Sequence, residues 1–199
     1  MEHRIITVSR EWASGGHTVA ELTAKELGIP CYDTQIIQET AKRTGLSEDL
    51  VKEAEQRMTG SFLYNLVMSV NSERNYIEQI YKSEKDIVIE KAAEGPCVIV
   101  GRGADFVVAE KLPTLRAFVY SNMKRRIRHA VENYGIDETK AQKEIIRMDK
   151  ERSIHMKTFT GLNWGDRINY DIMLNAGFLG EEECARILVQ AYKDLDGKA

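Results

Sequence analysis

The chain has 199 residues, 43% of them hydrophobic, which is enough for one sizeable core in a single domain. Its formal charge of -3 gives no global attraction for nucleic acid or for an anionic membrane, so any binding of anions has to rest on local basic clusters. Three isolated cysteines without a CxxC pair, and no signal-peptide pattern at residues 1–8, favour a reducing cytoplasm and argue against disulfides and structural zinc. No apolar run approaches the roughly 20 residues of a membrane span.

Short β-branched apolar runs alternate with helical patterns along the chain. This alternation predicts an α/β fold with parallel strands rather than a sandwich or a bundle. The predicted strands are Ile5 to Val8, Ile29 to Tyr32, Cys97 to Val100, Leu115 to Val119 and Ile172 to Leu174. Several are continuous apolar runs, as expected for strands that are buried on both faces.

Helical patterns fill most of the remainder. From Leu46 to Glu94 the pattern is amphipathic and contains no strand, so we expect a helical insertion there, with Ser47 as a helix N-cap. A basic helical stretch runs from Met123 to Lys157 with a break near "NYGID". An amphipathic helix with an acidic first turn closes the chain.

The segment at residues 6–28 has the pattern of a strand, a glycine-containing loop and a helix. The first N–H groups of such a helix lack partners and, together with the helix dipole, favour a bound phosphate. We expect the phosphates of a nucleotide to bind at Ser14, Gly15, Gly16, His17 and Thr18, with the Thr18 hydroxyl on a phosphate-bound Mg²⁺. The alternative is a tight turn whose glycines serve helix packing only.

The full GxxxxGK[ST] pattern of a phosphate loop is absent, because His17 stands where the lysine is normally found. A neutral histidine cannot replace a permanent charge, and Glu11 would repel phosphates if it faced inward. Arg10 or a distant arginine is therefore expected to supply the charge. His17 as an ordinary polar residue of a first helical turn remains an open alternative.

Two further segments place polar residues directly after predicted strands, where ligands bind in open α/β sheets. Asp33 and Thr34 follow the second strand, and we expect them to bind a substrate; the alternative for Asp33 is a helix N-cap. Arg102 follows the third strand between two glycines and is the strongest catalytic candidate, since a guanidinium can bind a phosphate bidentately. A turn with a solvated arginine is the alternative.

The basic helices contain the remaining candidates. Arg147 and Arg152 belong either to a charged exposed helix with local ion pairs or to a lid that closes over a polyphosphate and places arginine on the transferring group. In the stretch from Met123, most basic side chains cannot share one helical face, and Arg126 is the candidate to point inward.

Taken together, "ITVSREWASGGHTVAELTAKELGIPCYD", "CVIVGRGADFVV", "RMDKERSIHMKTFTGLNWGD" and "NYDIMLNAGFLG" resemble, in order and spacing, the cytidylate-kinase-like family of P-loop nucleoside monophosphate kinases. The resemblance spans nearly the whole chain. It implies a three-layer P-loop NTPase-type fold, with a parallel sheet of about five strands flanked by helices. It also implies a single kinase-like domain over residues 1–199, with an acceptor-binding insertion at 46–94 and a lid at 145–165.

The activity implied by this resemblance is ATP-dependent phosphoryl transfer to a nucleoside monophosphate, with CMP or dCMP as the default acceptor and ATP and Mg²⁺ as cofactors. By motif position, Gly15, Gly16, His17 and Thr18 would face the donor, Asp33, Arg102 and Asp171 would face the acceptor, and Arg147 and Arg152 would be the lid arginines.

The chain departs from the family pattern at the loop lysine, at Gly103 in place of the aspartate of a GRD turn, at Gln38-Glu39 where an arginine is expected, and at Asn175. Two alternatives therefore stay open: a nucleotide- or anion-binding protein that has lost catalysis, and a P-loop kinase of a small non-nucleotide metabolite. A homodimer formed through the helical insertion is also left open.

Overall fold

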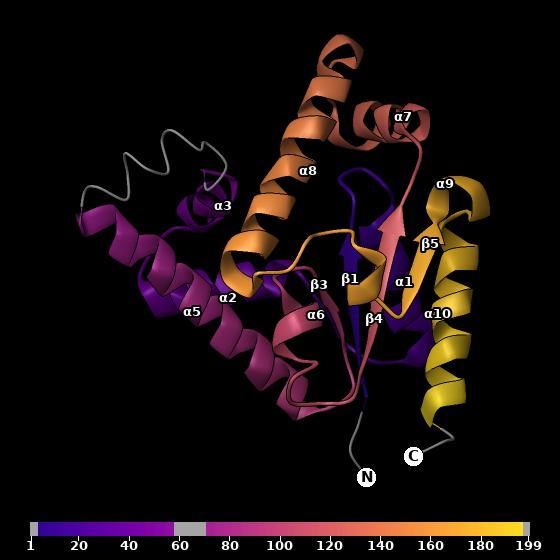
Figure 1. Ribbon diagram of the computed structural model, residues 1–199, viewed down its shortest axis with the longest axis horizontal. Helices are drawn as coiled ribbons and strands as arrows, with labels where there is room; N and C mark the ends of the chain where they lie inside the picture. Colours follow the sequence, from indigo (N-terminus) through magenta and orange to yellow (C-terminus); the bar gives the residue numbers. More distant parts are fainter. Residues whose placement is uncertain (1–3, 58–70, 197–199) are drawn as a thin grey trace.

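The computed structural model describes residues 4–57 and 71–196. Its centre is a five-stranded sheet of order β2-β3-β1-β4-β5, in which every pairing is parallel (Figure 1). The strands are β1 (Ile5–Arg10), β2 (Cys31–Tyr32), β3 (Val98–Val100), β4 (Thr114–Tyr120) and β5 (Ile172–Asn175). All five predicted strands are confirmed, with ends that differ from the prediction by at most two residues.

Both faces of the sheet are buried, because successive side chains of a strand point to opposite faces. On β1, Ile6 and Val8 pack with α1 (Gly16–Leu27) and α10 (Glu181–Asp196). Ile5, one residue away, packs on the other face with α5 (Asn71–Glu94) and α6 (Ala104–Val107). The result is a helix–sheet–helix sandwich of three layers, which confirms the predicted fold.

The helices agree with the sequence pattern wherever they are described. α2 (Thr34–Thr44) precedes the insertion, which contributes α3 (Glu48–Arg57) and α5; its residues 58–70 lie outside the described part of the chain. The N-cap at Ser47 is confirmed, since its Oγ accepts a hydrogen bond from Leu50 N at 3.2 Å. The basic stretch forms α7 (Met123–Tyr134) and α8 (Glu138–Thr160), followed by η1 (Arg167–Asn169) and α9 (Ala176–Leu179).

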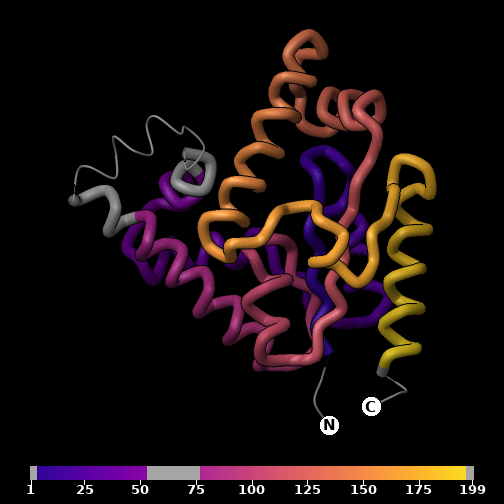
Figure 2. The backbone as a smooth tube through the Cα atoms, viewed as in Figure 1, coloured from indigo at the N-terminus to yellow at the C-terminus, as the bar shows by residue number. Residues whose placement is uncertain are grey.

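Because the strands are parallel, their carboxyl ends meet at one edge of the sheet. The strand arrows in Figure 1 point toward α7, and α8 descends from that end between the insertion helices and the sheet (Figures 1 and 2). The segments that follow β1, β2 and β3 therefore share this edge with α8.

Within residues 4–57 and 71–196, no helix is long and apolar enough to cross a membrane. Cys31, Cys97 and Cys184 carry free thiols. Burial raises the pKa of the Cys31 and Cys97 thiols to about 12, so both stay protonated and unreactive near neutral pH.

Candidate active site

The loop between β1 and α1 presents the start of a helix to the carboxyl edge of the sheet. Gly15 caps α1 with φ of +86°, and the first bond of the helix runs from Val19 N to Gly15 O over 3.0 Å. The N–H groups of Gly16, His17 and Thr18 therefore have no acceptor inside the helix. Together with the helix dipole they favour a negative charge in front of the loop.

Gly15 and Gly16 stand at the start of α1 and are also closely packed against neighbouring side chains. A Cβ on Gly15 would lie 2.3 Å from Glu181 Oε1, and a Cβ on Gly16 would lie 2.5 Å from Arg10 Cβ. A residue with a side chain fits at neither position without a shift of its neighbours. The glycines thus serve close packing, and Gly15 also supplies the positive φ with which α1 begins.

Two polar side chains of the loop are turned away from the anion position. Ser14 Oγ donates hydrogen bonds to Glu11 O at 2.9 Å and to Val119 O at 3.1 Å. The Glu11 carboxylate accepts from Ser121 N at 3.0 Å and lies 3.3 Å from Arg126 Nη1. The repulsion that Glu11 would cause if it faced inward is therefore not present in this structure.

His17, at the position of the absent lysine, has a carboxylate at each ring nitrogen. Nδ1 lies 2.9 Å from Asp33 Oδ2, and Nε2 lies 3.2 Å from Glu21 Oε1. The hydrogen bond with Asp33 raises the pKa of the imidazole above its usual 6.5, although partial burial opposes this. His17 is thus favoured as a cation, but its charge faces these two carboxylates.

Asp33 is the centre of a charged cluster at the end of β2. Its side chain makes no capping bond to α2, so the structure does not show the N-cap alternative. The carboxylate lies 4.0 Å from Arg10 Nη2 and 3.7 Å from Arg102 Nη2. Burial by itself would raise the pKa of Asp33, but the His17 hydrogen bond and the two guanidinium charges outweigh it and hold the pKa well below its usual value.

The turn after β3 carries Arg102 inward. Gly101, Arg102 and Gly103 have φ of +71°, +57° and +63°, and a Cβ on Gly101 would lie 2.1 Å from Arg10 Nη1. A non-glycine residue with positive φ is strained, and such strain is found mostly at functional sites. The Arg102 side chain is 12% exposed, and burial lowers its pKa to about 10, with Asp33 opposing the shift. The solvated-arginine alternative does not describe this buried side chain.

A buried carboxyl from the insertion, Glu84 on α5, also reaches this cluster. Its Oε1 lies 3.7 Å from Arg102 Nη1, and the residue is 2% exposed. Burial raises the pKa of Glu84 to about 8, so the neutral acid is favoured at pH 7. Sequence reasoning missed Glu84, because it stands in the charged run "SEKD", which looks like a solvated helical face.

Of the two predicted lid arginines, α8 presents one to the site. Arg152 Nη1 donates to Arg10 O at 2.8 Å, and burial lowers the Arg152 pKa to about 9, reinforced by the charge of Arg10. The Arg147 side chain is 44% exposed and forms ion pairs with Glu144 and Glu151 of its own helix. The structure therefore brings Arg152 to the cluster and holds Arg147 on α8.

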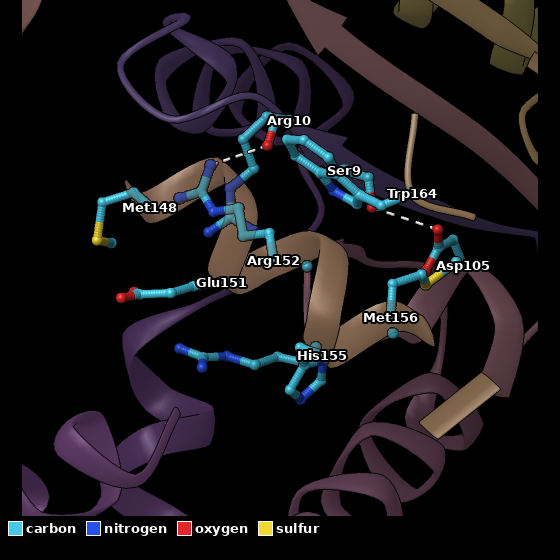
Figure 3. A pocket seen from close by; sticks show the side chains of 12 residues that line it. Ser9, Arg10, Asp105, Met148, Glu151, Arg152, His155, Met156 and Trp164 are labelled. Carbon is cyan, nitrogen blue, oxygen red and sulfur yellow. Dashed lines mark hydrogen bonds between the residues drawn. The ribbon is translucent and has the colours of Figure 1, made fainter. Parts of the chain in front are cut away.

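A cavity of about 240 Å³ lies between the sheet edge and α8. Figure 3 shows its wall, with the Arg10 and Arg152 side chains close together and Ser9 donating to Asp105 at 3.3 Å. His155 also lines the cavity, and burial lowers its pKa to about 4, so it is neutral near pH 7. Neither Asp105 nor His155 was predicted, although His155 stands three residues after Arg152, on the same helical face.

The other predicted residues lie at the margins or outside this cavity. Thr18 is half-buried in the first turn of α1, and Thr34 is exposed beside Asp33 at the start of α2. Asp171 precedes β5, at the opposite end of that strand from the cavity, and its Oδ1 accepts from Arg116 Nη2 at 2.8 Å. The structure does not bring Asp171 to the charged cluster.

Comparisons with known proteins agree with this architecture. Residues 5–177 match the model of the cytidylate kinase-like family. A cytidylate kinase of Sulfurisphaera tokodaii is 24% identical over 190 residues, which cover 94% of this chain and 94% of the relative. A cytidylate kinase of Methanopyrus kandleri is also 24% identical, over 96% of this chain and 94% of that protein.

Solved structures share the fold. An uncharacterized protein from Eubacterium ventriosum has a TM-score of 0.73 at 23% identity, over 95% of this chain and 98% of that one. The shikimate kinase of Bacteroides thetaiotaomicron has a TM-score of 0.55 at 15% identity, over 99% of both chains. The match over residues 5–177 and the five-stranded kinase-type sheet lead to one conclusion: this chain belongs to the cytidylate kinase-like family.

Proposed function

We propose that this protein transfers the γ-phosphoryl group of ATP to a nucleoside monophosphate, with CMP or dCMP as the acceptor. Family membership and the kinase fold support a phosphotransferase of the nucleotide-kinase type. The observation that carries the proposal is the convergence of Arg10, Arg102 and Arg152 on one cavity, with the Arg10 side chain packed against Gly16 at the start of α1. Such a site catalyses phosphoryl transfer by positioning and electrostatics, without a covalent intermediate.

The donor half of the site is built from main chain. The N–H groups of Gly16, His17 and Thr18 would hold the donor phosphates, whereas Ser14 N is bound to Glu11 O at 3.4 Å; Arg10 would supply a charge beside them. Bound ATP–Mg²⁺ supplies the phosphoryl group and a cation that offsets the phosphate charge. The Thr18 hydroxyl would be one oxygen ligand of that cation; no group of three or more His, Cys, Asp or Glu side chains in residues 4–57 and 71–196 could hold a metal on its own.

The acceptor half is built from charged side chains. Arg102 would bind the acceptor phosphate, while Asp33 and Thr34 would orient the acceptor from the end of β2. Arg102 is held in place before substrate arrives, because its strained turn packs against Arg10 and its side chain is buried. Asp171 has no part in this arrangement, because it lies at the other end of β5 in an ion pair with Arg116.

Arg152 would stabilise the charge that spreads over the transferring group. Its guanidinium is buried and fixed on Arg10 O, between the two halves of the site. A buried cation acts more strongly on a developing charge than a solvated one, because water does not screen it. Arg147 would take this role only after it leaves Glu144 and Glu151.

The direct test is ADP formation from ATP–Mg²⁺ in the presence of a panel of acceptors: CMP, dCMP, UMP, AMP and GMP. We expect turnover that depends on the acceptor and is fastest with CMP or dCMP. Binding of ATP–Mg²⁺, measured by calorimetry, without turnover on any monophosphate would contradict the proposal.

That contradicting result is what a nucleotide-binding protein without catalysis would give. The observation that favours this alternative is His17, whose charge replaces the lysine but is engaged by Asp33 and Glu21. Turnover on sugars or other small alcohols, but on no monophosphate, would instead identify a kinase of a non-nucleotide metabolite.

A further inference from the structure

The main chain of the donor loop is held from outside by two side chains of the α7–α8 helix pair. Trp12 N donates to Asp149 Oδ1 at 2.8 Å, and Arg126 Nε donates to Trp12 O at 2.8 Å. Arg126 Nη2 also donates to Asp149 Oδ2 at 2.5 Å. Both main-chain polar groups of Trp12 are therefore bound by two side chains that are also bound to each other, and we name this pair, Arg126 and Asp149, the loop clamp.

The rest of this loop segment is bound just as completely. Arg10 O accepts from Arg152 Nη1, and Glu11 N donates to Val119 O at 3.0 Å. Glu11 O accepts from Ser14 Oγ. The carbonyl of Arg10 and all main-chain polar groups of residues 11 and 12 thus have partners within the protein, which leaves the N–H groups at the start of α1 for a ligand.

The loop clamp also holds a side chain and a strained residue in place. Arg126 is 3% exposed, and its Nη1 lies 3.3 Å from Glu11 Oε2, which keeps that carboxylate away from the anion position. Ala13, next to Trp12, has φ of +58°, although it is not a glycine. Such a conformation persists only where its surroundings impose it.

We propose that Arg126 and Asp149 are positioning residues that hold the donor loop in its anion-binding shape and tie it to the lid helix. This inference rests on the proposed function. In a loop without the lysine, the phosphates depend on the direction of main-chain N–H groups, so the shape of the loop matters more than in a loop with a lysine. The loop clamp supplies that shape, and Arg152, one turn from Asp149 on α8, keeps its place relative to the loop through the same contact.

Loss of the loop clamp should weaken the donor side selectively. A shift of about 1 Å in positioning groups remote from the chemistry can lower a rate by about 10²-fold. Because the hydrogen bonds and ion pairs of Arg126 and Asp149 join them to residues 11 and 12 and to each other, acceptor binding should not change. A general loss of structure would weaken both substrates together, so the split between them reports on positioning.

The experiment compares Arg126→Gln, Arg126→Lys and Asp149→Asn with a matched control, Arg125→Gln, which changes the exposed neighbouring arginine of α7. Binding of ATP–Mg²⁺, tripolyphosphate and CMP is measured by calorimetry, KM and kcat by the ADP assay, and folding by thermal unfolding. We expect Arg126→Gln to raise the KM and Kd for ATP–Mg²⁺ and the Kd for tripolyphosphate by about tenfold or more, the equivalent of one lost charged hydrogen bond. The lysine variant, which keeps the charge, should recover part of the loss, while CMP binding and the control stay at wild-type values.

Folded clamp variants with wild-type donor binding would overturn the inference, as would equal weakening of donor and acceptor. If Arg126→Gln does not fold, Asp149→Asn tests the inference instead. Its amide oxygen can still accept a hydrogen bond from Trp12 N, while the ion pair with Arg126 is lost. Absence of ATP–Mg²⁺ binding to the wild type would overturn the proposed function and this inference together. If the wild type binds ATP–Mg²⁺ and the clamp variants bind it equally well, the inference is overturned but the proposed function is not.

Discussion

The two halves of the site are built from different parts of the chain. In the proposed mechanism the donor half consists of the main-chain N–H groups at the start of α1 with Arg10 beside them, whereas the acceptor half consists of the side chains of Asp33, Thr34 and Arg102. Main-chain groups do not change with side-chain identity, which explains how the donor half keeps its geometry with a histidine at the lysine position. The acceptor half does not tolerate substitution in this way, because each of its charges is carried by a single side chain.

The largest effect is therefore expected in the acceptor half. Arg102→Ala should lower kcat/KM by about 10²-fold or more, since it removes the guanidinium proposed to bind the acceptor phosphate and stabilise its charge. Steady-state ADP formation measures the loss, and thermal unfolding shows that the variant is folded. Turnover close to wild type would remove Arg102 from the site.

The two lid arginines sharpen the comparison on a single helix. Arg152→Gln should lower kcat by about tenfold or more, because its buried guanidinium lies between the two halves of the site. Arg147→Gln should have a smaller effect, since exposed ion pairs such as those of Arg147 contribute little energy. If Arg147→Gln lowered kcat more than Arg152→Gln, Arg147 would be the lid arginine that acts on the transferring group, as the sequence suggests.

The donor half should be sensitive to bulk rather than to charge. Gly15→Ala places a methyl group against Glu181 and should weaken ATP–Mg²⁺ binding by about tenfold, the equivalent of one misplaced hydrogen bond. Gly28→Ala is the matched control, because Gly28 has φ of +67° and open space around its Cα. Both variants should lose about 1 kcal/mol of stability through backbone strain. Equal affinity of the two variants for ATP–Mg²⁺, measured by calorimetry, would contradict the claim that the main chain at Gly15 positions the donor phosphates.

The prediction for Glu84 concerns stability rather than activity. Burial raises the pKa of Glu84 from 4.5 to about 8, so the folded state binds a proton that the unfolded state has already released in this range. Stability should therefore fall as pH rises through this window, by up to about 1.4 kcal/mol per pH unit.

Glu84→Gln should remove this component of the pH dependence. The check is urea unfolding of both proteins between pH 5 and 8, with the free energy of unfolding compared at each pH. Curves that run parallel over the whole range would contradict the assigned state of Glu84.

Much of the fold could be predicted because its signals are local. The apolar runs that form β1 and β3 are buried on both faces, and periodicity is enough to find them. Arg102 and Asp33 could be placed near each other because parallel strands bring their carboxyl ends to the same edge. The limits of these predictions lie where the direction of a side chain is set by tertiary packing.

Glu84 and Asp149 illustrate that limit. Each stands in a run of charges that has the pattern of a solvated helical face, and only the packing of α5 and α8 against the sheet edge shows that these charges are turned inward. Arg126 is the exception: it is the basic residue predicted to point inward from its helix, and it is 3% exposed. Asp171 shows the converse: its position in the family motif suggested that it faces the acceptor, but it precedes β5, so it lies at the other end of the strand.

The central claim is that the N–H groups at the start of α1 hold the donor phosphates although the loop has no lysine. A crystal structure with ADP–Mg²⁺, or with sulfate, tests it most directly. The account predicts an anion within hydrogen-bonding distance of the N–H groups of Gly16, His17 and Thr18, with Arg102 still facing the cavity. An anion bound elsewhere, with the Glu181 side chain filling the front of the loop and Arg102 turned to solvent, would contradict it.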